Sequence, residues 1–331
     1  MLDNTFKAIV VEESSKGLFK QSIKSRNISD LPDGDILVKV KYSSLNYKDG
    51  LSFYGNKGVS SNYPHTPGID AMGTVKSSNT PNIKIGSKVI VSGYDLGMNT
   101  AGGFGEYIRV PQEWISILPE GLDSLESMII GTAGLTAGLC INSIELLNHI
   151  DGSKAIVTGA TGGVGCIAVK LLSKLGAEVT AITGKNSSEG FLRSIGASKV
   201  MIRDHFINSV KKPMGKAIWD IAIDVAGGNL LSGLIASMKY NGVVTCCGLV
   251  AGPKFETTVF PFILRGVSLI GIDSAEESIH NKTKIWKNFA SKWKLNNLKE
   301  LYKIVDMDGM MHEIDKISNG QQVGRVVLKH A

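Results

Sequence analysis

The distribution of apolar residues predicts two kinds of structure in successive parts of the chain. Residues 6–11 (FKAIVV) and 36–42 (ILVKVKY) are rich in β-branched residues, and polar residues alternate with apolar ones in the second segment, a pattern typical of strands. Residues 43–110 contain short segments such as GSKVIVSG and GGFGEYIRV, separated by Gly, Pro and Asn. This part is predicted to be a compact, mostly β domain with irregular loops.

After this region the pattern changes to helices that alternate with strands. LPEGLDSLESMIIGTAGLTAGLCINSIELL predicts a long apolar helix. The strand segments SKAIVTGA, AEVTAIT, KVMIRD, AIWDIAIDVAG, GVVTCCG and VSLIGIDS follow, with helical segments between most of them. Such alternation is typical of a doubly wound parallel sheet. A last strand, GRVVLK, falls outside the alternation, and we expect it to return to the N-terminal β domain.

Length and composition are consistent with this picture. A chain of 331 residues with 43% hydrophobic residues and 38 glycines suits two domains of an α/β protein. No uninterrupted apolar run reaches the ~18 residues of a membrane span, and the N-terminus lacks the apolar stretch of a signal peptide, so we expect a cytoplasmic protein. The four cysteines form no CxxC pair. They are predicted to be small buried side chains rather than zinc ligands or disulfides.

The chain is mildly basic, with a formal net charge of +6. Much of the excess lies in residues 281–303, NKTKIWKNFASKWKLNNLKELYK. A solvated lysine face on an amphipathic helix is favoured over nucleic-acid binding. A third interpretation is electrostatic attraction of an anionic substrate.

A glycine-rich loop indicates a nucleotide site. Residues 159–165, GATGGVG, connect a predicted strand to a predicted helix. Glycines in such a loop allow a tight turn, close approach to a pyrophosphate and close packing of helix on strand. The helix that starts there directs its free N–H groups toward the phosphates. The spacing departs from GxGxxG, so the strand–helix–strand context carries most of this interpretation.

The end of the next strand predicts the type of dinucleotide. Thr183 lies eighteen residues beyond Gly165, near the place where an NAD site has a carboxylate on the ribose 2′-hydroxyl. Here the sequence is Thr183-Gly184-Lys185, and no acid occurs before Glu189. A lysine and a hydroxyl attract a 2′-phosphate, so the sequence favours NADPH. The alternative is that Lys185 is an ordinary exposed loop lysine. Arg203, after the third strand, is a second candidate for the phosphate or the adenine.

Motifs along the whole chain, from about residue 6 to 329, resemble the medium-chain dehydrogenase/reductase superfamily. They are SSLNYKDGLSFYGNKG, YPHTPGIDAMGTV, GGFGEYIRV, MIIGTAGLTAGLCI, VTGATGGVGCIAVKLLSKLG, FPFILRGVSLIGIDS and GRVVLK. The similarity is to the zinc-free, quinone-oxidoreductase-like branch that includes bacterial acrylyl-CoA reductases. The resemblance implies an α/β protein with a GroES-like catalytic domain over residues 1–125 and a Rossmann NADPH-binding domain over 126–265. Residues 266–331 then supply the last Rossmann strand and a segment that returns to the catalytic domain.

The resemblance also implies the residues that contact the cofactor. They are Tyr47, Ala160, Thr161, Gly162, Gly163, Val164, Thr183, Gly184, Lys185, Arg203, Leu249, Ile263, Ser274 and Arg325. Relatives carry Ser-Gly-Arg where this chain has Thr-Gly-Lys, so the charge is kept and the bidentate guanidinium is lost. The resemblance further implies a homodimer formed through the Rossmann edge strand VSLIGID.

The chain lacks the ligands of the zinc-dependent members of the superfamily. No cysteine precedes Cys140, and SSLNYKD and PGIDAMG stand where those enzymes have a cysteine and a Gly-His-Glu motif. His65 with Asp70 nearby is a poor zinc site. We therefore expect no metal and interpret His65 as a turn residue.

The implied reaction is NADPH-dependent reduction of the activated double bond of acrylyl-CoA to propanoyl-CoA, with hydride transfer to the β-carbon. Asn46 and Tyr47 are the candidate catalytic residues, and a hydrogen-bonded turn is the structural alternative for this pair. Thr132 is expected either to contact the nicotinamide amide or to cap a helix. Two other functions remain open. One is a quinone or generic enone oxidoreductase, and the other is a nucleotide- or RNA-binding protein with little catalysis.

Overall fold

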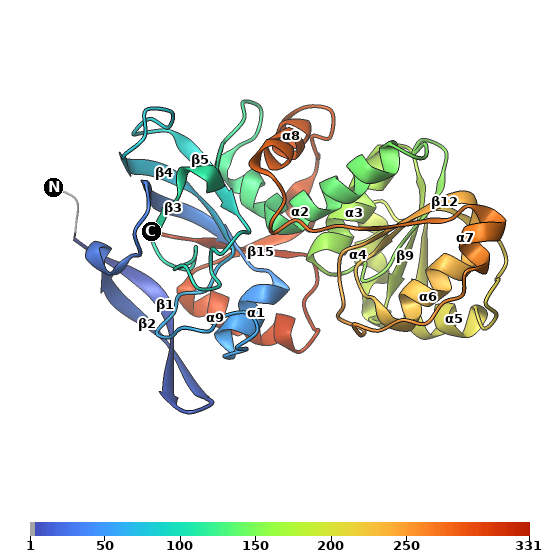
Figure 1. Ribbon diagram of the computed structural model, residues 1–331, viewed down its shortest axis with the longest axis horizontal. Helices are drawn as coiled ribbons and strands as arrows, with labels where there is room; N and C mark the ends of the chain where they lie inside the picture. Colours follow the sequence, from blue (N-terminus) through green and yellow to red (C-terminus); the bar gives the residue numbers. More distant parts are fainter. Residues whose placement is uncertain (1–3) are drawn as a thin grey trace. The chain divides into compact units, whose positions relative to one another are not determined.

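The computed structural model describes residues 4–331 and divides the chain into two compact units (Figure 1). Unit 1 consists of Met1–Thr132, Ala275–Lys292 and Tyr302–Ala331. Unit 2 consists of Ala133–Ser274 and Trp293–Leu301. The divisions differ from those expected at 125/126 and 265/266. The first division lies later because the N–H of Thr132 is hydrogen-bonded to Asp70 of unit 1. The strand Ser268–Gly271 pairs within the sheet of unit 2, as expected for the last Rossmann strand of residues 266–331.

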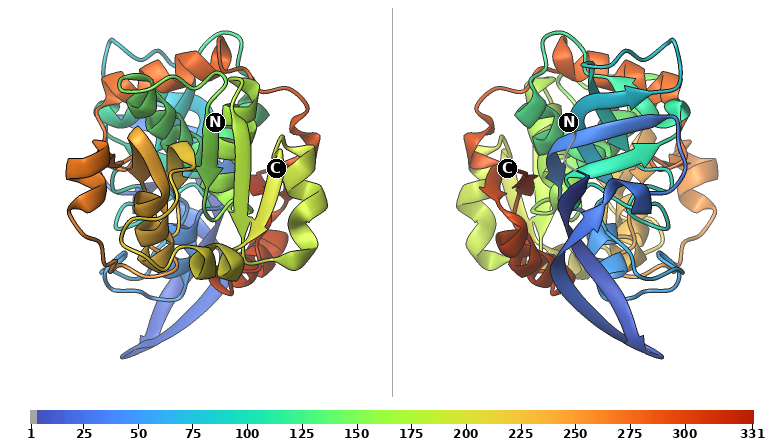
Figure 2. Two further views of the ribbon diagram at one scale, coloured as in Figure 1. Left: turned by 90° about the vertical axis from the view of Figure 1, so that its right-hand side faces the viewer. Right: turned by 90° about the vertical axis from the view of Figure 1, so that its left-hand side faces the viewer.

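Unit 1 is built mainly from antiparallel strands. Its strands are β1 (Thr5–Ser15), β2 (Leu18–Asn27), β3 (Ile36–Ser44), β4 (Asp70–Ser78), β5 (Lys88–Ser92), β6 (Tyr107–Val110), β7 (Ile115–Ile117), β14 (Tyr302–Val305) and β15 (Arg325–Lys329). The strands β1 and β2 form a long hairpin (Figures 1 and 2). The others form a sheet of order β14-β15-β3-β4-β5-β7, with β6 paired to β3.

The sequence pattern explains the central strand of unit 1. Along β3, Ile36, Val38 and Val40 are buried while Lys39 and Lys41 are exposed, because successive side chains point to opposite faces. The strand β15, which contains most of GRVVLK, pairs antiparallel with β3, so the predicted return of the C-terminal strand is confirmed. The strands β2 and β14 were not predicted, and β14 lies where the basic segment ends.

Three helices belong wholly to unit 1: α1 (Tyr47–Phe53), α8 (Ile279–Ala290) and α9 (Met307–Ser318). Short 3-10 turns lie at Ile28–Asp30 and Gln112–Trp114. The helix α8 carries the basic segment, and Lys284 and Lys287 are exposed as expected. Lys282 departs from that expectation, since it is 1% exposed. It lies on the inward stripe of the helix with Ile285, Trp286 and Phe289.

Unit 2 contains the doubly wound parallel sheet. Its strands are β8 (Lys154–Val157), β9 (Glu178–Thr183), β10 (Lys199–Ile202), β11 (Trp219–Asp224), β12 (Met238–Cys246) and β13 (Ser268–Gly271). All neighbouring pairs are parallel, in the order β10-β9-β8-β11-β12-β13. The chain reverses direction across the sheet between β10 and β11. Right-handed crossovers therefore place helices on both faces (Figure 2).

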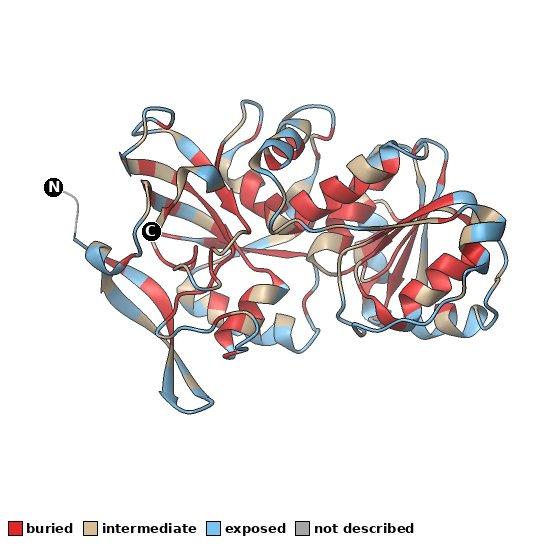
Figure 3. Ribbon diagram, viewed as in Figure 1, coloured by how far each residue is buried: buried red, intermediate tan, exposed pale blue. Residues whose placement is uncertain are grey.

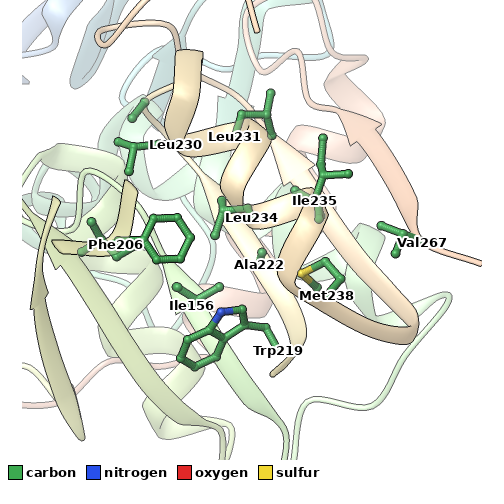
Figure 4. Close-up of a cluster of buried hydrophobic side chains, with 13 residues drawn as sticks. Ile156, Phe206, Trp219, Ala222, Leu230, Leu231, Leu234, Ile235, Met238 and Val267 are labelled. Carbon is green, nitrogen blue, oxygen red and sulfur yellow. The ribbon is translucent and has the colours of Figure 1, made fainter. Parts of the chain in front are cut away.

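The helices of unit 2 are α3 (Gly163–Lys174), α4 (Glu189–Ser194), α5 (Arg203–Ser209), α6 (Gly228–Ser237) and α7 (Phe260–Arg265), with 3-10 turns at Asn186–Ser188 and Leu298–Glu300. The central strands β8, β9, β11 and β12 are largely buried, as are the inner sides of these helices, whereas the edge strands β10 and β13 are partly exposed (Figure 3). On one face, Phe206 of α5 and Leu234 of α6 pack on Trp219 and Ala222 of β11 (Figure 4). The predicted α/β architecture of two different domains is confirmed.

The long apolar helix is interrupted. The helix α2 (Ser124–Glu145) contains Gly131 at φ 53° and ψ −163°, which is not helical. Among residues 4–331, α2 is the one helix with the length and apolarity to cross a membrane, and 83% of its most apolar window is buried inside the protein. Such burial is typical of a core helix.

Candidate functional site

The glycine-rich loop of unit 2 joins β8 to α3. Gly159 has φ +58°, a conformation that favours glycine. The N–H of Ala160 donates to the carbonyl oxygen of Ile182 at 3.0 Å, which attaches the loop to β9. A Cβ atom at Gly165 would lie 2.2 Å from the carbonyl oxygen of Gly159. Only glycine at 165 therefore lets the start of α3 pack this closely against the loop.

Two cationic side chains lie near this loop, at the ends of the next two strands. The Nζ atom of Lys185, after β9, donates to Thr161 Oγ1 in the loop at 3.3 Å. The N–H of Lys185 donates to Thr183 Oγ1 at 3.0 Å. A Cβ atom at Gly184 would lie 3.5 Å from the guanidinium carbon of Arg203, so Arg203 lies over Gly184. Burial lowers the pKa of Lys185, as expected for an ammonium group that is partly removed from water.

Most of the other predicted contacts in unit 2 also follow the carboxyl ends of strands. Ser274 comes after β13, and its Oγ accepts from Thr136 Oγ1 at 2.6 Å. Leu249 comes after β12 and is 60% exposed, whereas Ile263, in α7, is 69% exposed. The carboxyl edge of a doubly wound sheet is the usual place for a dinucleotide, at the point where the strand order reverses. The residues of this edge fit an NAD(P) cofactor.

A buried carboxylate, Asp224, also lies at this edge and was not predicted from the sequence. Asp224, the last residue of β11, accepts from Thr158 Oγ1 at 2.7 Å and from the N–H of Gly227 at 2.8 Å. Burial raises the pKa of Asp224, and these two donors oppose that effect. The carboxylate connects the ends of β8 and β11, the two strands at which the order of the sheet reverses. The sequence signal that could have identified Asp224 is an acidic residue at the end of a predicted buried strand, in the segment AIWDIAIDVAG.

Unit 1 contains a second buried carboxylate, Asp70, at the start of β4 and fully buried. It accepts hydrogen bonds from five donor atoms on four residues. These are Ser44 Oγ at 2.6 Å, Asn46 Nδ2 at 2.8 Å, Ser92 Oγ at 2.6 Å, Thr132 Oγ1 at 2.8 Å, and Thr132 N–H at 2.9 Å and 3.0 Å from the two carboxylate oxygens. We call these residues the Asp70 cluster.

The Asp70 cluster stabilises the interruption of α2. A Cβ atom at Gly131 would lie 2.3 Å from Ser44 Oγ and 2.8 Å from Asp70 Oδ2, so glycine is required there. After the interruption, the N–H of Thr132 finds its acceptor in Asp70. Before it, Arg325 Nε donates to the carbonyl oxygen of Ile129 at 3.0 Å. An acid at the start of the second helical segment and a base at the end of the first complement the helix dipoles.

Several predicted residues of unit 1 thus have identified structural partners. Asn46 donates from Nδ2 to Asp70 and to the carbonyl oxygen of Ser44, so both of its amide hydrogens are used. Thr132 Oγ1 donates to Asp70. Arg325 is 2% exposed and also donates from Nη1 to the carbonyl oxygen of Leu45. Tyr47 differs from these three, since it is 42% exposed. Their roles toward substrate and cofactor stay predictions.

Asp49 fixes the start of α1, beside Asn46 and Tyr47. Its carboxylate accepts from the N–H of Asn46 at 2.7 Å and from the N–H of Ile69 at 2.8 Å. Burial raises the pKa of Asp49 to about 7, against the effect of these N–H donors. Asp49 therefore fixes the turn that precedes Tyr47, and it was not among the residues predicted from the sequence.

The residues of unit 1 do not fit a zinc ion. Within residues 4–331, no three His, Cys, Asp or Glu side chains are grouped so that they could hold a metal. His65 is 3% exposed, and its Nε2 is hydrogen-bonded to the carbonyl oxygen of Gly97 at 2.9 Å. Asp70 accepts hydrogen bonds from Ser44, Asn46, Ser92 and Thr132.

Comparison with known protein families agrees with the two units. The family model described as "Alcohol dehydrogenase GroES-like domain" matches residues 32–120, and the model described as "Zinc-binding dehydrogenase" matches residues 163–291. A GroES-like unit together with a doubly wound sheet whose carboxyl edge fits a dinucleotide defines a nucleotide-dependent oxidoreductase.

Three proteins are similar over nearly the whole chain. Acrylyl-CoA reductase AcuI of Ruegeria pomeroyi is 38% identical over 98% of both chains. The crystal structure of Escherichia coli YhdH with bound NADPH matches with a TM-score of 0.92 and 39% identity, covering 97% of this chain and 99% of that one. Bacillus subtilis YhfP, provisionally described as a quinone oxidoreductase, matches in its NAD-bound structure with a TM-score of 0.95 and 37% identity, covering 99% and 100%. The chain belongs to the medium-chain dehydrogenase/reductase superfamily and is an oxidoreductase.

Proposed function

We propose that this protein reduces the activated carbon–carbon double bond of acrylyl-CoA, or a close 2-enoyl thioester, to the saturated thioester with NADPH. The observation that carries the proposal is the 38% identity, over 98% of both chains, with a protein named acrylyl-CoA reductase. The bound dinucleotide supplies the hydride. The chain's own residues hold the dinucleotide, exclude water and stabilise the charge that develops on the thioester.

The chemistry of the buried side chains in unit 1 favours conjugate reduction over reduction of a plain ketone. When hydride adds to the β-carbon, the carbonyl oxygen of the thioester takes up the negative charge, and hydrogen-bond donors can stabilise it there. Reduction of a plain ketone places full charge on one alkoxide oxygen, a task for which many enzymes use a Lewis acid. The side chains of the Asp70 cluster form no ligand set for such an ion.

The position of the hydride in the product tests the proposal. Reaction of acrylyl-CoA with NADPH deuterated at C4 should give propanoyl-CoA with one deuterium at the β-carbon, and reaction in D2O should place deuterium at the α-carbon. Mass spectrometry and NMR of the product distinguish the two positions. Deuterium from the cofactor at the α-carbon, or no propanoyl-CoA at all, would contradict the proposal.

Lys185 and Arg203 are proposed to bind the 2′-phosphate of NADPH. Lys185 contacts the glycine-rich loop through Thr161, and Arg203 lies over Gly184. The relatives differ at this point, because YhdH was solved with NADPH and YhfP with NAD. The two cations of this chain favour the phosphorylated form.

We expect NADPH to bind at least about tenfold more tightly than NADH, or about 1.4 kcal/mol. Lys185→Ala should remove most of this preference by weakening NADPH binding alone, because NADH lacks the phosphate. Lys174→Ala, an exposed lysine at the far end of α3, serves as the control. Fluorescence titration gives the dissociation constants, and equal values for the two cofactors in the wild-type protein would refute the assignment.

Tyr47 is proposed to act at the reacting end of the cofactor, either as a proton donor or by packing. The Tyr47→Phe variant separates these roles. A fall in kcat with unchanged NADPH affinity would indicate proton donation, whereas weaker NADPH binding would indicate packing. Steady-state rates and NADPH titrations measure both. If neither quantity changes by more than twofold, Tyr47 has no role in the site.

Reduction of a quinone or a simple enone is the second candidate function. The similarity to YhfP, provisionally described as a quinone oxidoreductase, favours it. Both reactions would use the same dinucleotide site at the carboxyl edge of the unit 2 sheet, so the two functions differ only in the substrate.

A nucleic-acid-binding role has less support, since the buried position of Lys282 reduces the basic surface of α8. A cytoplasmic location stays a prediction.

We also propose a homodimer formed through β13. This strand is at the edge of the sheet of unit 2, with β12 on its other side. Exposed apolar residues are concentrated in the chain just before it: Leu249, Val250, Val259, Phe260, Ile263 and Leu264. An open sheet edge beside an apolar patch of this kind is a common interface.

The double variant Val259→Asp/Leu264→Asp should convert the dimer to a monomer, because two buried charges at an interface cannot be paired. Light scattering after size exclusion should give twice 35.4 kDa for the wild-type protein and 35.4 kDa for the variant. Leu146→Asp, at a residue 77% exposed elsewhere in unit 2, should remain dimeric. A monomeric wild-type protein would exclude the proposal.

A further inference from the structure

Lys48 is a half-buried cation that has no anionic partner in the part of the chain that the structure describes. It lies in the first turn of α1, directly after Tyr47, and its Nζ donates one side-chain hydrogen bond, to the sulfur of Met98 at 3.8 Å. A thioether is a weak acceptor, and the first turn of a helix does not favour a positive charge. Within residues 4–331 Lys48 forms no ion pair.

The carboxylates on the neighbouring segments have other partners. Asp49, the next residue, accepts from backbone N–H groups. Asp95, three residues before Met98, accepts from Asn99 Nδ2 at 3.1 Å and from Thr100 Oγ1 at 2.8 Å. Lys57 of the same unit, by contrast, forms an ion pair with Glu13. The positive charge of Lys48 is therefore available to an anionic group from outside the chain.

The hydrogen bonds of the neighbouring side chains show which residue near Asn46 is available to bind a group from outside the chain. Ser44, Asn46, Ser92 and Thr132 all direct their side-chain donors inward, to Asp70. Tyr47 and Lys48 are the next residues along the chain, and neither donates to the Asp70 cluster. Of these two, only Lys48 carries a charge that can stabilise an anionic oxygen.

We infer that Lys48 is a catalytic residue that donates a hydrogen bond to the thioester carbonyl oxygen and stabilises its negative charge. Hydride forms the new C–H bond at the β-carbon, the π pair of the C=C bond forms a double bond between the α-carbon and the carbonyl carbon, and the C=O π pair moves onto the oxygen beside Lys48. A proton that originates from water then forms the C–H bond at the α-carbon, and the electron pair on oxygen restores the carbonyl double bond. This inference rests on the proposed function and adds a residue to its site.

Kinetics of Lys48 variants test the inference. Lys48→Met should lower kcat for acrylyl-CoA by about 100-fold or more, the usual effect of losing one donor to a developing oxyanion. The dissociation constant of NADPH should change by less than twofold. Lys48→Arg keeps the charge and should recover most of the rate. Lys84→Met, which removes an exposed lysine of the same unit, controls for the general loss of positive charge.

Chemical rescue distinguishes catalysis from a structural role. Methylammonium added to Lys48→Ala should raise kcat in proportion to its concentration, because the small cation can enter the space left by the side chain. Rates of Lys48→Met within threefold of wild type, or no rescue together with loss of NADPH binding, would overturn the inference. A wild-type protein inactive on acrylyl-CoA would overturn the proposed function, and the inference with it. An active wild type with active Lys48 variants would overturn the inference alone.

Discussion

Replacing Asp70 by alanine should lower the free energy of unfolding by about 3–5 kcal/mol, because each buried donor left without an acceptor costs about 1–3 kcal/mol. Five donor atoms would lose their acceptor. The three hydroxyl groups can rotate toward other acceptors, but the N–H of Thr132 is fixed by the backbone. Chemical denaturation followed by tryptophan fluorescence measures the loss.

Asp33→Ala is the control for this experiment. Asp33 is an exposed carboxylate in the same unit, and its removal should change the free energy of unfolding by less than about 0.5 kcal/mol. Asp70→Asn should fall between the two, since the amide keeps one acceptor oxygen. If Asp70→Ala is as stable as Asp33→Ala, the Asp70 cluster does not stabilise the interruption of α2.

Gly165→Ala should weaken NADPH binding by about 100-fold, which corresponds to about 2.7 kcal/mol. The added Cβ would lie 2.2 Å from Gly159 O and 2.7 Å from Ala160 Cα. Both are backbone atoms, so the start of α3 must move away from the loop. The N–H groups that would face the pyrophosphate then lose their positions. Titration with NADPH and the rise in melting temperature on adding NADPH report the loss.

Gly190→Ala provides the matched control, because a Cβ there meets nothing within 4 Å. Gly190 lies in α4 of the same unit, and alanine in a helix is neutral or stabilising. NADPH should raise the melting temperature of Gly190→Ala as much as that of the wild type and raise that of Gly165→Ala far less. Equal NADPH affinities of all three proteins would contradict the assigned role of the glycine-rich loop.

Much of the fold could be predicted because its signals are local. In unit 2 each buried parallel strand is a short apolar run followed by a helix, as in SKAIVTGA, and this alternation determines the class of sheet. The glycine-rich loop shows its role through backbone conformation, since Gly159 and Gly165 satisfy steric requirements that adjacent residues impose. The return of β15 was inferred because it interrupts the alternation.

The parts that were missed depend on residues far apart in the sequence. Asp70 collects donors from residues 44 to 132, and nothing near Asp70 in the sequence indicates these partners. The long apolar segment gave no sign of the interruption at Gly131, because the atoms that exclude a side chain there come from Ser44, Asp70 and Arg325. Lys282 was expected on a solvated face, but it donates to the carbonyl oxygens of Ser92 and Ala275.

The substrate itself is the most direct test of the account. Initial rates of NADPH oxidation should be measured with acrylyl-CoA and with 1,4-benzoquinone, under the same conditions and with NADH in parallel. We predict that kcat/KM for acrylyl-CoA exceeds that for the quinone by at least about 100-fold, a difference of about 2.7 kcal/mol in transition-state stabilisation, and that NADPH is the preferred reductant. Efficient reduction of the quinone with no detectable turnover of acrylyl-CoA would contradict the proposed function.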